Sequence, residues 1–370
     1  MRHLSVWFYL VSVLFSASVS AETLTLWNAH SLEHLQPELE AFSRLTGHKV
    51  QQQHFRADRI RDQVLAAAVL PDLYFIPSDQ ISNVQEYHLA PWPEAIPRMR
   101  QLRTDGMLGQ AWYGLPINLG NHLVMYFRKD KVKPIDDVEN IPAGRLGWPR
   151  DQAYWFVAFL TAAGGWPFDG DQLKLDTPAM VSALTTYKDL YVRHPASACS
   201  LMCNEQKLVE GEIDYMLDGD WAYQMLHQTL GDKLGVAMLP TLHGQVMHPL
   251  SSSYVLARTD NMSPAKRQAT EELARFLLSD DSQARMYLHS MLLPAVPMVA
   301  ERMQGQMSPD MQVMSRQLLQ SKPMPNSRKM MLFWLVMGKG LDLLVNEEFT
   351  ADEVAAKMQS MVQQEQVLHP

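Results

Sequence analysis

Short strand-like runs and amphipathic helical stretches alternate along the chain after residue 22. The run Leu24-Thr25-Leu26-Trp27 has the β-branched and aromatic character of a strand. Apolar residues then recur at helical spacing from Leu35 to Leu45, and Thr46-Gly47 ends the helix. The pattern continues with a strand at 48–55, a helix at 60–70 that Pro71 stops, and a strand at 73–76. This β-α-β-α-β order predicts an α/β fold with a mixed, mostly parallel sheet flanked by helices.

A second alternation begins after a strand at 123–127. We expect helices at 154–163, 178–192, 205–210, 264–278, 282–288, 330–345 and 351–362, with strands at 213–217, 234–238 and 253–257. No internal repeat and no low-complexity linker separates the two alternations. Two domains without a linker predict lobes that are joined by several short crossings.

The N-terminus has the pattern of a secretory signal peptide. Arg2 and His3 form a short basic region, an apolar stretch runs from Leu4 to Phe15, and small residues at 19–21 precede the polar chain. The apolar stretch is too short to span a bilayer. We therefore expect residues 1–21 to be removed and the remaining protein to be periplasmic.

Length, charge and composition narrow the function classes. The 349 residues after the signal exceed what one hydrophobic core usually supports, which favours two domains. The formal net charge of −8 disfavours nucleic acid as a partner. A content of 47% hydrophobic and 19% charged residues is typical of a globular protein.

Cys199 and Cys203 are the two cysteines of the chain. In an oxidising compartment such a pair predicts a disulfide. A metal site is the weaker interpretation, because no second Cys or His pair at ligand spacing accompanies them.

The sequence carries none of the common catalytic or cofactor motifs. It has no Gly-x-Ser-x-Gly elbow, no His-Glu-x-x-His, no Walker loop and no Gly-x-Gly-x-x-Gly. Asp169-Gly170-Asp171 resembles the start of a calcium loop but lacks the later ligands, which favours a turn. We therefore expect a binding protein without catalytic residues, metal or cofactor. A secreted hydrolase is the weakest alternative.

Collinear motifs over nearly the whole chain resemble the maltose/maltodextrin-binding group of periplasmic solute-binding proteins of ABC importers. They include, in order, residues 24–27, 45–50, 70–75, 112–116, 127–130, 162–165, 211–212, 219–222, 235–240, 323–326 and 333–334. Each motif is weak alone, but their order and spacing are specific.

The resemblance implies two α/β lobes with a ligand cleft between them. Three crossings are expected near Pro116–Asn121, Leu250–Leu256 and Gln304–Asp310. They divide the chain into a first lobe of residues 22–118 and 256–303 and a second lobe of residues 119–255 and 304–370. Such a cleft closes by hinge bending, and the importer recognises the closed form.

The resemblance also nominates the residues that hold the ligand. Tyr154, Trp221 and Trp334 match the stacking aromatics of the second lobe, whereas Trp155 is expected in the core. Flat aromatics suit sugars, which present apolar C–H faces inside a rim of hydroxyls.

The first lobe departs from the maltodextrin pattern. Asp79 is retained, but uncharged side chains replace several expected charges. The candidate polar contacts are Asn28, His30, Ser31, Gln80, Asn121 and Gln152. Hydrogen bonds to charged groups contribute about 1.5–3 kcal/mol, against about 1 kcal/mol for neutral pairs. We expect a ligand other than maltodextrin, or weaker maltodextrin binding; other saccharides, polyols and sugar phosphates stay open.

Two binding functions remain. In the first, a monomeric protein delivers a carbohydrate to the membrane permease subunits of an ABC importer. In the second, the closed form is presented to a membrane receptor or sensor kinase.

Overall fold

The computed structural model describes residues 21–57, 59–170, 172–195, 201–290, 292–327, 329–346 and 349–368. Cys199, and all of the expected signal peptide except Ala21, lie outside these residues. The Cys199–Cys203 disulfide therefore stays a prediction. Among the described helices, none is both long and apolar enough to cross a membrane.

The first of two main sheets follows the predicted β-α-β-α-β start of the chain. Its strands lie in the order β15-β7-β14-β3-β1-β2, and β4 and β16 also pair with β14. Their bounds are Thr23–Asn28 (β1), Lys49–His54 (β2), Leu73–Pro77 (β3), Leu89–Ala90 (β4), Gly114–Gly120 (β7), Leu250–Thr259 (β14), Leu293–Pro294 (β15) and Lys322–Pro323 (β16). β1 is parallel to β2 and β3, whereas β14 is antiparallel to β3 and β7.

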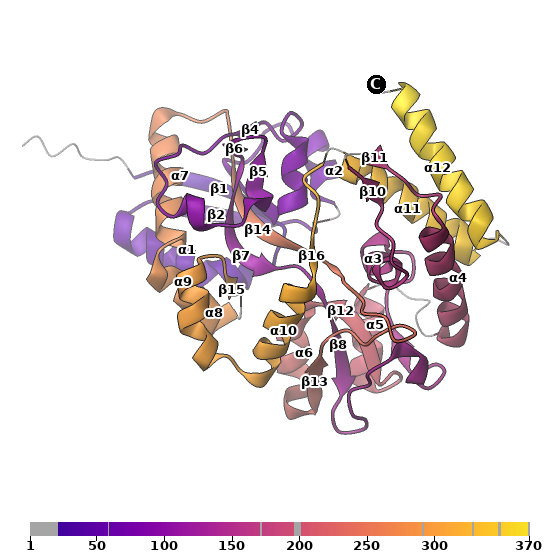
Figure 1. Ribbon diagram of the computed structural model, residues 1–370. Helices are drawn as coiled ribbons and strands as arrows, with labels where there is room; N and C mark the ends of the chain where they lie inside the picture. Colours follow the sequence, from indigo (N-terminus) through magenta and orange to yellow (C-terminus); the bar gives the residue numbers. More distant parts are fainter. Residues whose placement is uncertain are drawn as a thin grey trace, which may run out of the picture.

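Helices cover this sheet and complete what we call the first lobe. They are α1 (Leu32–Thr46), α2 (Ile60–Ala66), α7 (Pro264–Leu277), α8 (Asp280–Ser290) and α9 (Pro297–Met303). α1 buries Leu35, Leu39 and Phe42 on one face. It ends at Gly47, whose φ of 80° is a left-handed conformation that glycine adopts without steric cost. Figure 1 shows α7, α8 and α9 along the left side of the molecule.

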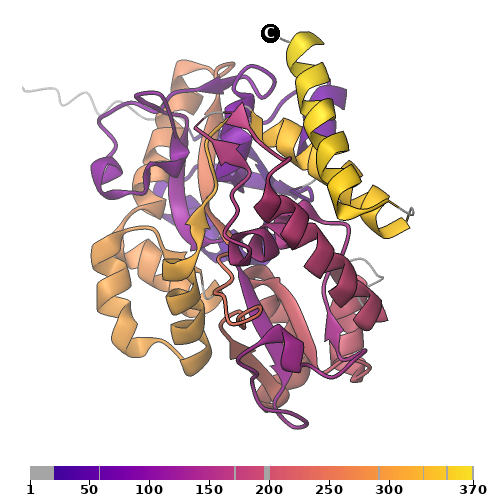
Figure 2. The same ribbon diagram turned by 45° about the vertical axis from the view of Figure 1, so that its right-hand side comes forward.

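A smaller sheet forms the centre of the second lobe. Its order is β13-β8-β12-β9, with bounds Leu123–Arg128 (β8), Leu146–Gly147 (β9), Tyr215–Gly219 (β12) and Leu234–Ala237 (β13). Helices α5 (Leu201–Glu210), α6 (Tyr223–Leu230) and α10 (Pro309–Gln320) pack on it. A further layer consists of α3 (Ala153–Ala162), α4 (Pro178–Arg193), α11 (Lys329–Asn346) and α12 (Ala351–Leu368). Figure 2 shows the yellow α11 and α12 against the magenta helices of this layer.

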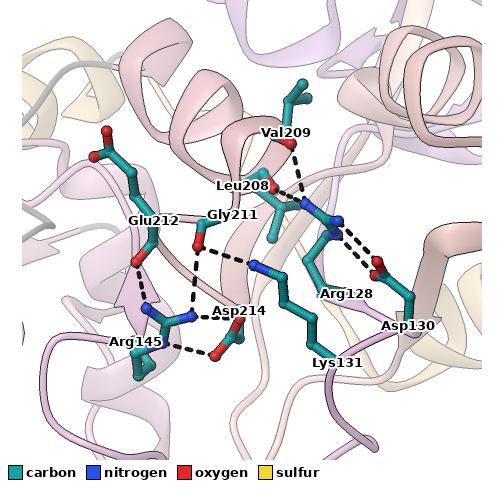
Figure 3. Close-up of polar contacts among 9 residues, drawn as sticks. All are labelled: Arg128, Asp130, Lys131, Arg145, Leu208, Val209, Gly211, Glu212 and Asp214. Carbon is teal, nitrogen blue, oxygen red and sulfur yellow. Dashed lines mark hydrogen bonds and ion pairs between the residues drawn. The ribbon is translucent and has the colours of Figure 1, made fainter.

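A polar network ties the C-terminal end of α5 to the sheet of the second lobe (Figure 3). The guanidinium of Arg128 on β8 donates to the carbonyl oxygens of Leu208 and Val209 at 3.2 and 3.0 Å. Arg145 pairs with Asp214 at 2.6 Å. Cations near a helix C-terminus satisfy its last carbonyls and oppose the negative end of the helix dipole. These charges are therefore engaged in holding the fold together.

The chain passes between the sheets beside the cavity described below. β7 of the first lobe ends at Gly120, and β8 of the second lobe begins at Leu123. β14 begins where Leu250 pairs with Lys322, and Ser252 pairs with Gly120. These short connections bring residues of both lobes to one place.

Candidate functional site

A narrow cavity of about 30 Å³ lies where the two lobes meet. The first lobe contributes the ends of β1 and β7, α1, β14 and β15, and the second lobe contributes the start of α6, the turn before it and α10. Its wall consists of His30, His34, Asn118, Leu119, Asn121, Asp220, Trp221, Tyr223, Gln224, Tyr254, Leu292, Leu293, Met311 and Met314. Ligand pockets usually measure about 300–1,000 Å³. A small-molecule ligand therefore needs the lobes to be further apart than they are here.

The turn after β1 places one predicted contact on the wall and uses another to hold the turn. Asn28 is fully buried; its Oδ1 accepts the His30 backbone N–H at 2.7 Å, and its Nδ2 donates to Gln52 at 3.0 Å. His30 lines the cavity, whereas Ser31 is exposed at the start of α1 and lies off the wall. Both ends of the Asn28 amide are thus occupied, and its Oδ1 positions the backbone of His30.

Two imidazoles pack together on the first-lobe wall. The rings of His30 and His34 lie 4.1 Å apart, and the ring of Tyr254 lies 4.6 Å from His30. Burial and the neighbouring His34 hold the pKa of His30 well below its usual value, and burial also lowers the pKa of His34. Both rings are therefore neutral at neutral pH, so this wall offers hydrogen-bonding groups without positive charge.

The predicted aromatics form one group, but only Trp221 lies on the cavity wall. The ring of Tyr154 lies 5.9 Å from that of Trp221 and 6.3 Å from that of Trp334. The Tyr154 hydroxyl donates toward the carbonyl oxygens of Asn121 and Leu250, the latter at 3.1 Å. Tyr154 therefore anchors two of the connections between the lobes, and its ring also packs against that of Trp334.

Asp79 and Gln80 lie in a short 3-10 helix after β3, away from the cavity wall. The Asp79 carboxylate is buried and accepts hydrogen bonds from Trp334 and, at 3.4 Å, from Gln80. Burial raises the pKa of Asp79 to about 6. Gln80 accepts from the Tyr87 hydroxyl at 2.8 Å. Asp79 thus links the first lobe to Trp334 of the second.

Asn121 occupies a strained position between β7 and β8. Its φ of 47° is uncommon for a residue with a side chain, and its Nδ2 donates to Ser252 at 2.7 Å. A Cβ at the preceding Gly120 would lie 2.2 Å from the Asp220 carboxylate, so glycine is required there. Asp220 itself lies 3.2 Å from His122.

The structure adds wall residues that the sequence analysis missed, and Gln152 joins the predicted residues that lie off the wall. His34 stands four residues after the predicted contact His30, and this spacing is a signal that could have identified it. The prediction missed His34 because α1 begins between the two residues. Asn118 is 2% exposed, and its Oδ1 has no hydrogen-bond partner among the described residues. A buried carbonyl oxygen without a donor favours a ligand that supplies one. Gln152 is exposed at the start of α3 and does not line the cavity.

The family of the chain follows from comparison with known proteins. The profile of the bacterial extracellular solute-binding proteins matches residues 53–313. The chain belongs to this family. This membership assigns a solute-binding, non-catalytic role to the chain. No curated protein matches the chain in sequence.

Solved structures show the same two-lobed periplasmic binding protein fold. The GacH receptor of Streptomyces glaucescens GLA.O superposes with a TM-score of 0.84 at 17% identity, covering 93% of this chain and 98% of that one. The receptor was studied without ligand and with acarbose, and was compared with the acarbose-loaded maltose-binding protein of Salmonella typhimurium. At this identity the likeness concerns the fold.

Proposed function

We propose that this protein binds an uncharged saccharide in the cavity between its lobes and delivers it to an ABC importer. The observation that carries the proposal is the composition of the wall, where a tryptophan ring lies among amides and neutral imidazoles. Trp221 offers a face for sugar C–H groups, and Asn118, Gln224 and His30 offer hydrogen-bonding groups.

The charge of the wall argues against anionic sugars. Among the lining residues there is no Lys or Arg, and Asp220 is the one acidic group. A phosphate or carboxylate in this place would lose water without gaining a cationic partner, which is strongly unfavourable. Sugar phosphates and uronic acids are therefore less favoured as ligands than uncharged saccharides.

The family and the fold support the transport role. Members of this family are extracellular solute-binding proteins, and the similar GacH receptor was solved in complex with acarbose and an acarbose homolog. We further propose that the protein acts in the periplasm as a monomer and that permease subunits in the membrane recognise its closed form.

A thermal-shift panel tests the ligand class. Uncharged mono- and oligosaccharides should include at least one that raises the melting temperature, because a ligand that binds only the folded state stabilises it by about 2.7 kcal/mol at 100 times its Kd. Glucose 6-phosphate and glucuronate serve as anionic comparisons. A rise with the anions alone, or with none of the panel, would contradict the proposal.

A further inference from the structure

His34 lies where a helix of the first lobe meets a helix of the second lobe across the cavity. It stands in the first turn of α1, which packs on β2 and α8. Its Nε2 lies 2.6 Å from the Oε1 of Gln224 on α6, which packs on α5 and β13. Because an amide oxygen only accepts, His34 must donate from Nε2. This hydrogen bond connects the two lobes directly beside the cavity wall that both residues line.

The neighbouring ring makes a second positive charge costly. His30 packs against His34 with ring centroids 4.1 Å apart, and the Nδ1 of His30 accepts the backbone N–H of Ser31 at 2.8 Å. Protonating that nitrogen would break the bond to Ser31. His30 and His34 are 7% and 5% exposed, so water screens their charges poorly.

Other charged or titratable groups face the pair from each side. The hydrogen bond with Gln224 favours the protonated form of His34 most, followed by Glu33 on α1 and Asp220 before α6. His34 and then His54 on β2 disfavour the protonated form of His30. Burial outweighs all three favourable groups around His34, and its pKa is lowered. Opening the lobes would remove Gln224 and Asp220 from His34 and admit water. Water stabilises the charged form of an imidazole better than a buried environment in which desolvation dominates.

We propose that the His34–Gln224 hydrogen bond helps to hold the cleft of the free protein closed, and that protonation of the buried His30–His34 pair weakens this closed arrangement. The inference rests on the proposed function in one respect: it assumes that the lobes close around this cavity. Acid then opens the cleft of the free protein.

The sign follows from proton linkage. A histidine whose pKa is lower in the closed form binds fewer protons there, so closure is favoured above the ordinary value of about 6.5 and weakens as the pH falls below it. Asp79 acts in the opposite sense. Its pKa is raised to about 6, so protonating it in acid favours the closed, buried form. His34 and Asp79 thus contribute with opposite sign to the pH dependence of closure. A variant of His34 keeps Asp79, so comparing it with the wild type isolates the contribution of His34.

Small-angle scattering of the full chain without ligand tests the proposal. Between about pH 8 and about pH 5 the radius of gyration of the wild type should rise. His34→Gln keeps an amide donor toward Gln224 but removes one of the two titrating rings, so its radius should rise less than that of the wild type. His289→Gln is the matched control, because His289 is an exposed histidine on α8, and it should follow the wild type. Circular dichroism at each pH confirms that the chains are folded.

A second variant provides an independent readout. Gln224→Leu removes the acceptor, and its radius at about pH 8 should already exceed that of the wild type at the same pH. A wild-type radius that does not change with pH, an equal rise in His34→Gln, or a compact Gln224→Leu would each overturn the proposal. No sugar is present, so failure here is distinct from failure of saccharide binding.

Discussion

Asp79 carries a carboxyl group that is buried where the first lobe contacts Trp334. Burial raises its pKa to about 6 from an ordinary 3.8. The folded protein therefore holds this proton more tightly than the unfolded chain does. Its contribution to stability is present below the unfolded value and is lost as the pH rises through about 6.

This shift predicts a pH-dependent effect of Asp79→Asn. Asparagine can still accept from Trp334 but never carries the charge. Relative to the wild type, the variant should gain on the order of 2 kcal/mol in free energy of unfolding between about pH 4 and about pH 7. Urea unfolding at both pH values measures the gain. Asp232→Asn, at an exposed position, should gain nothing. An equal difference between Asp79→Asn and wild type at both pH values would contradict the burial argument.

Two neighbouring tryptophans should respond differently to truncation. Trp221 is half-buried on the cavity wall, whereas Trp155 is 3% exposed and donates from Nε1 to Leu217 at 2.8 Å. Trp221→Ala should weaken saccharide binding by about 2 kcal/mol or more. Trp155→Ala should instead cost about 3–5 kcal/mol of stability.

Calorimetric affinity and melting temperature, measured on the same samples, separate the two roles. Trp334→Ala tests a third case, because Trp334 contacts Asp79 and lies off the wall. Its loss should lower the melting temperature more than the affinity. A Trp221→Ala protein that binds normally would remove Trp221 from the site.

At the scale of elements, periodicity predicted the long helices and the main strands but not all of their ends. The helix expected to reach Leu70 ends at Ala66, and Leu65 and Val69 are 60% and 82% exposed. Leu65 and Val69 have no neighbouring surface against which to pack. Because tertiary packing supplies most of the stability of a helix, these residues did not extend α2 beyond Ala66. Strands of two residues, such as β15 and β16, are too short to produce a periodic signal. The wall residues on β14 and α6 depend on such tertiary placement, which explains why Tyr254 and Gln224 were not predicted.

The contact of α3 with the connections between the lobes leads to a prediction for Tyr154. Tyr154→Phe removes the hydroxyl that donates toward Asn121 and Leu250. The free energy of unfolding should fall by about 1 kcal/mol, and hydrogen exchange near both connections should become faster. Tyr191→Phe is a matched control, because its hydroxyl donates to the Val345 carbonyl at 2.8 Å within the helical layer. It should lose similar stability without faster exchange at the connections. Equal exchange in the two variants would argue against the anchoring role of Tyr154.

At the scale of the whole molecule, the alternation of strands and helices was sufficient to predict two α/β lobes, and the solved structures share that fold. The width of the cleft could not be predicted from the sequence. It depends on side chains of α1 and α6, which lie 190 positions apart where His34 meets Gln224. Local pattern carries no information about such a pair.

The narrowness of the cavity predicts how the overall size of the protein responds to ligand. A space of about 30 Å³ cannot hold a saccharide, so the bound form must be wider than the arrangement described here and narrower than the open form. The ligand then fixes the lobe separation. We expect scattering of the saturated protein to give the same radius of gyration at about pH 5 and about pH 8. At about pH 5 this radius should be smaller than that of the free protein, whose cleft is open there. The probe is the uncharged saccharide that raises the melting temperature most, and Trp221→Ala at the same concentration should keep the radius of the free form. Equal radii for free and saturated wild type at about pH 5, with saturation verified by calorimetry, would show that binding does not close the lobes.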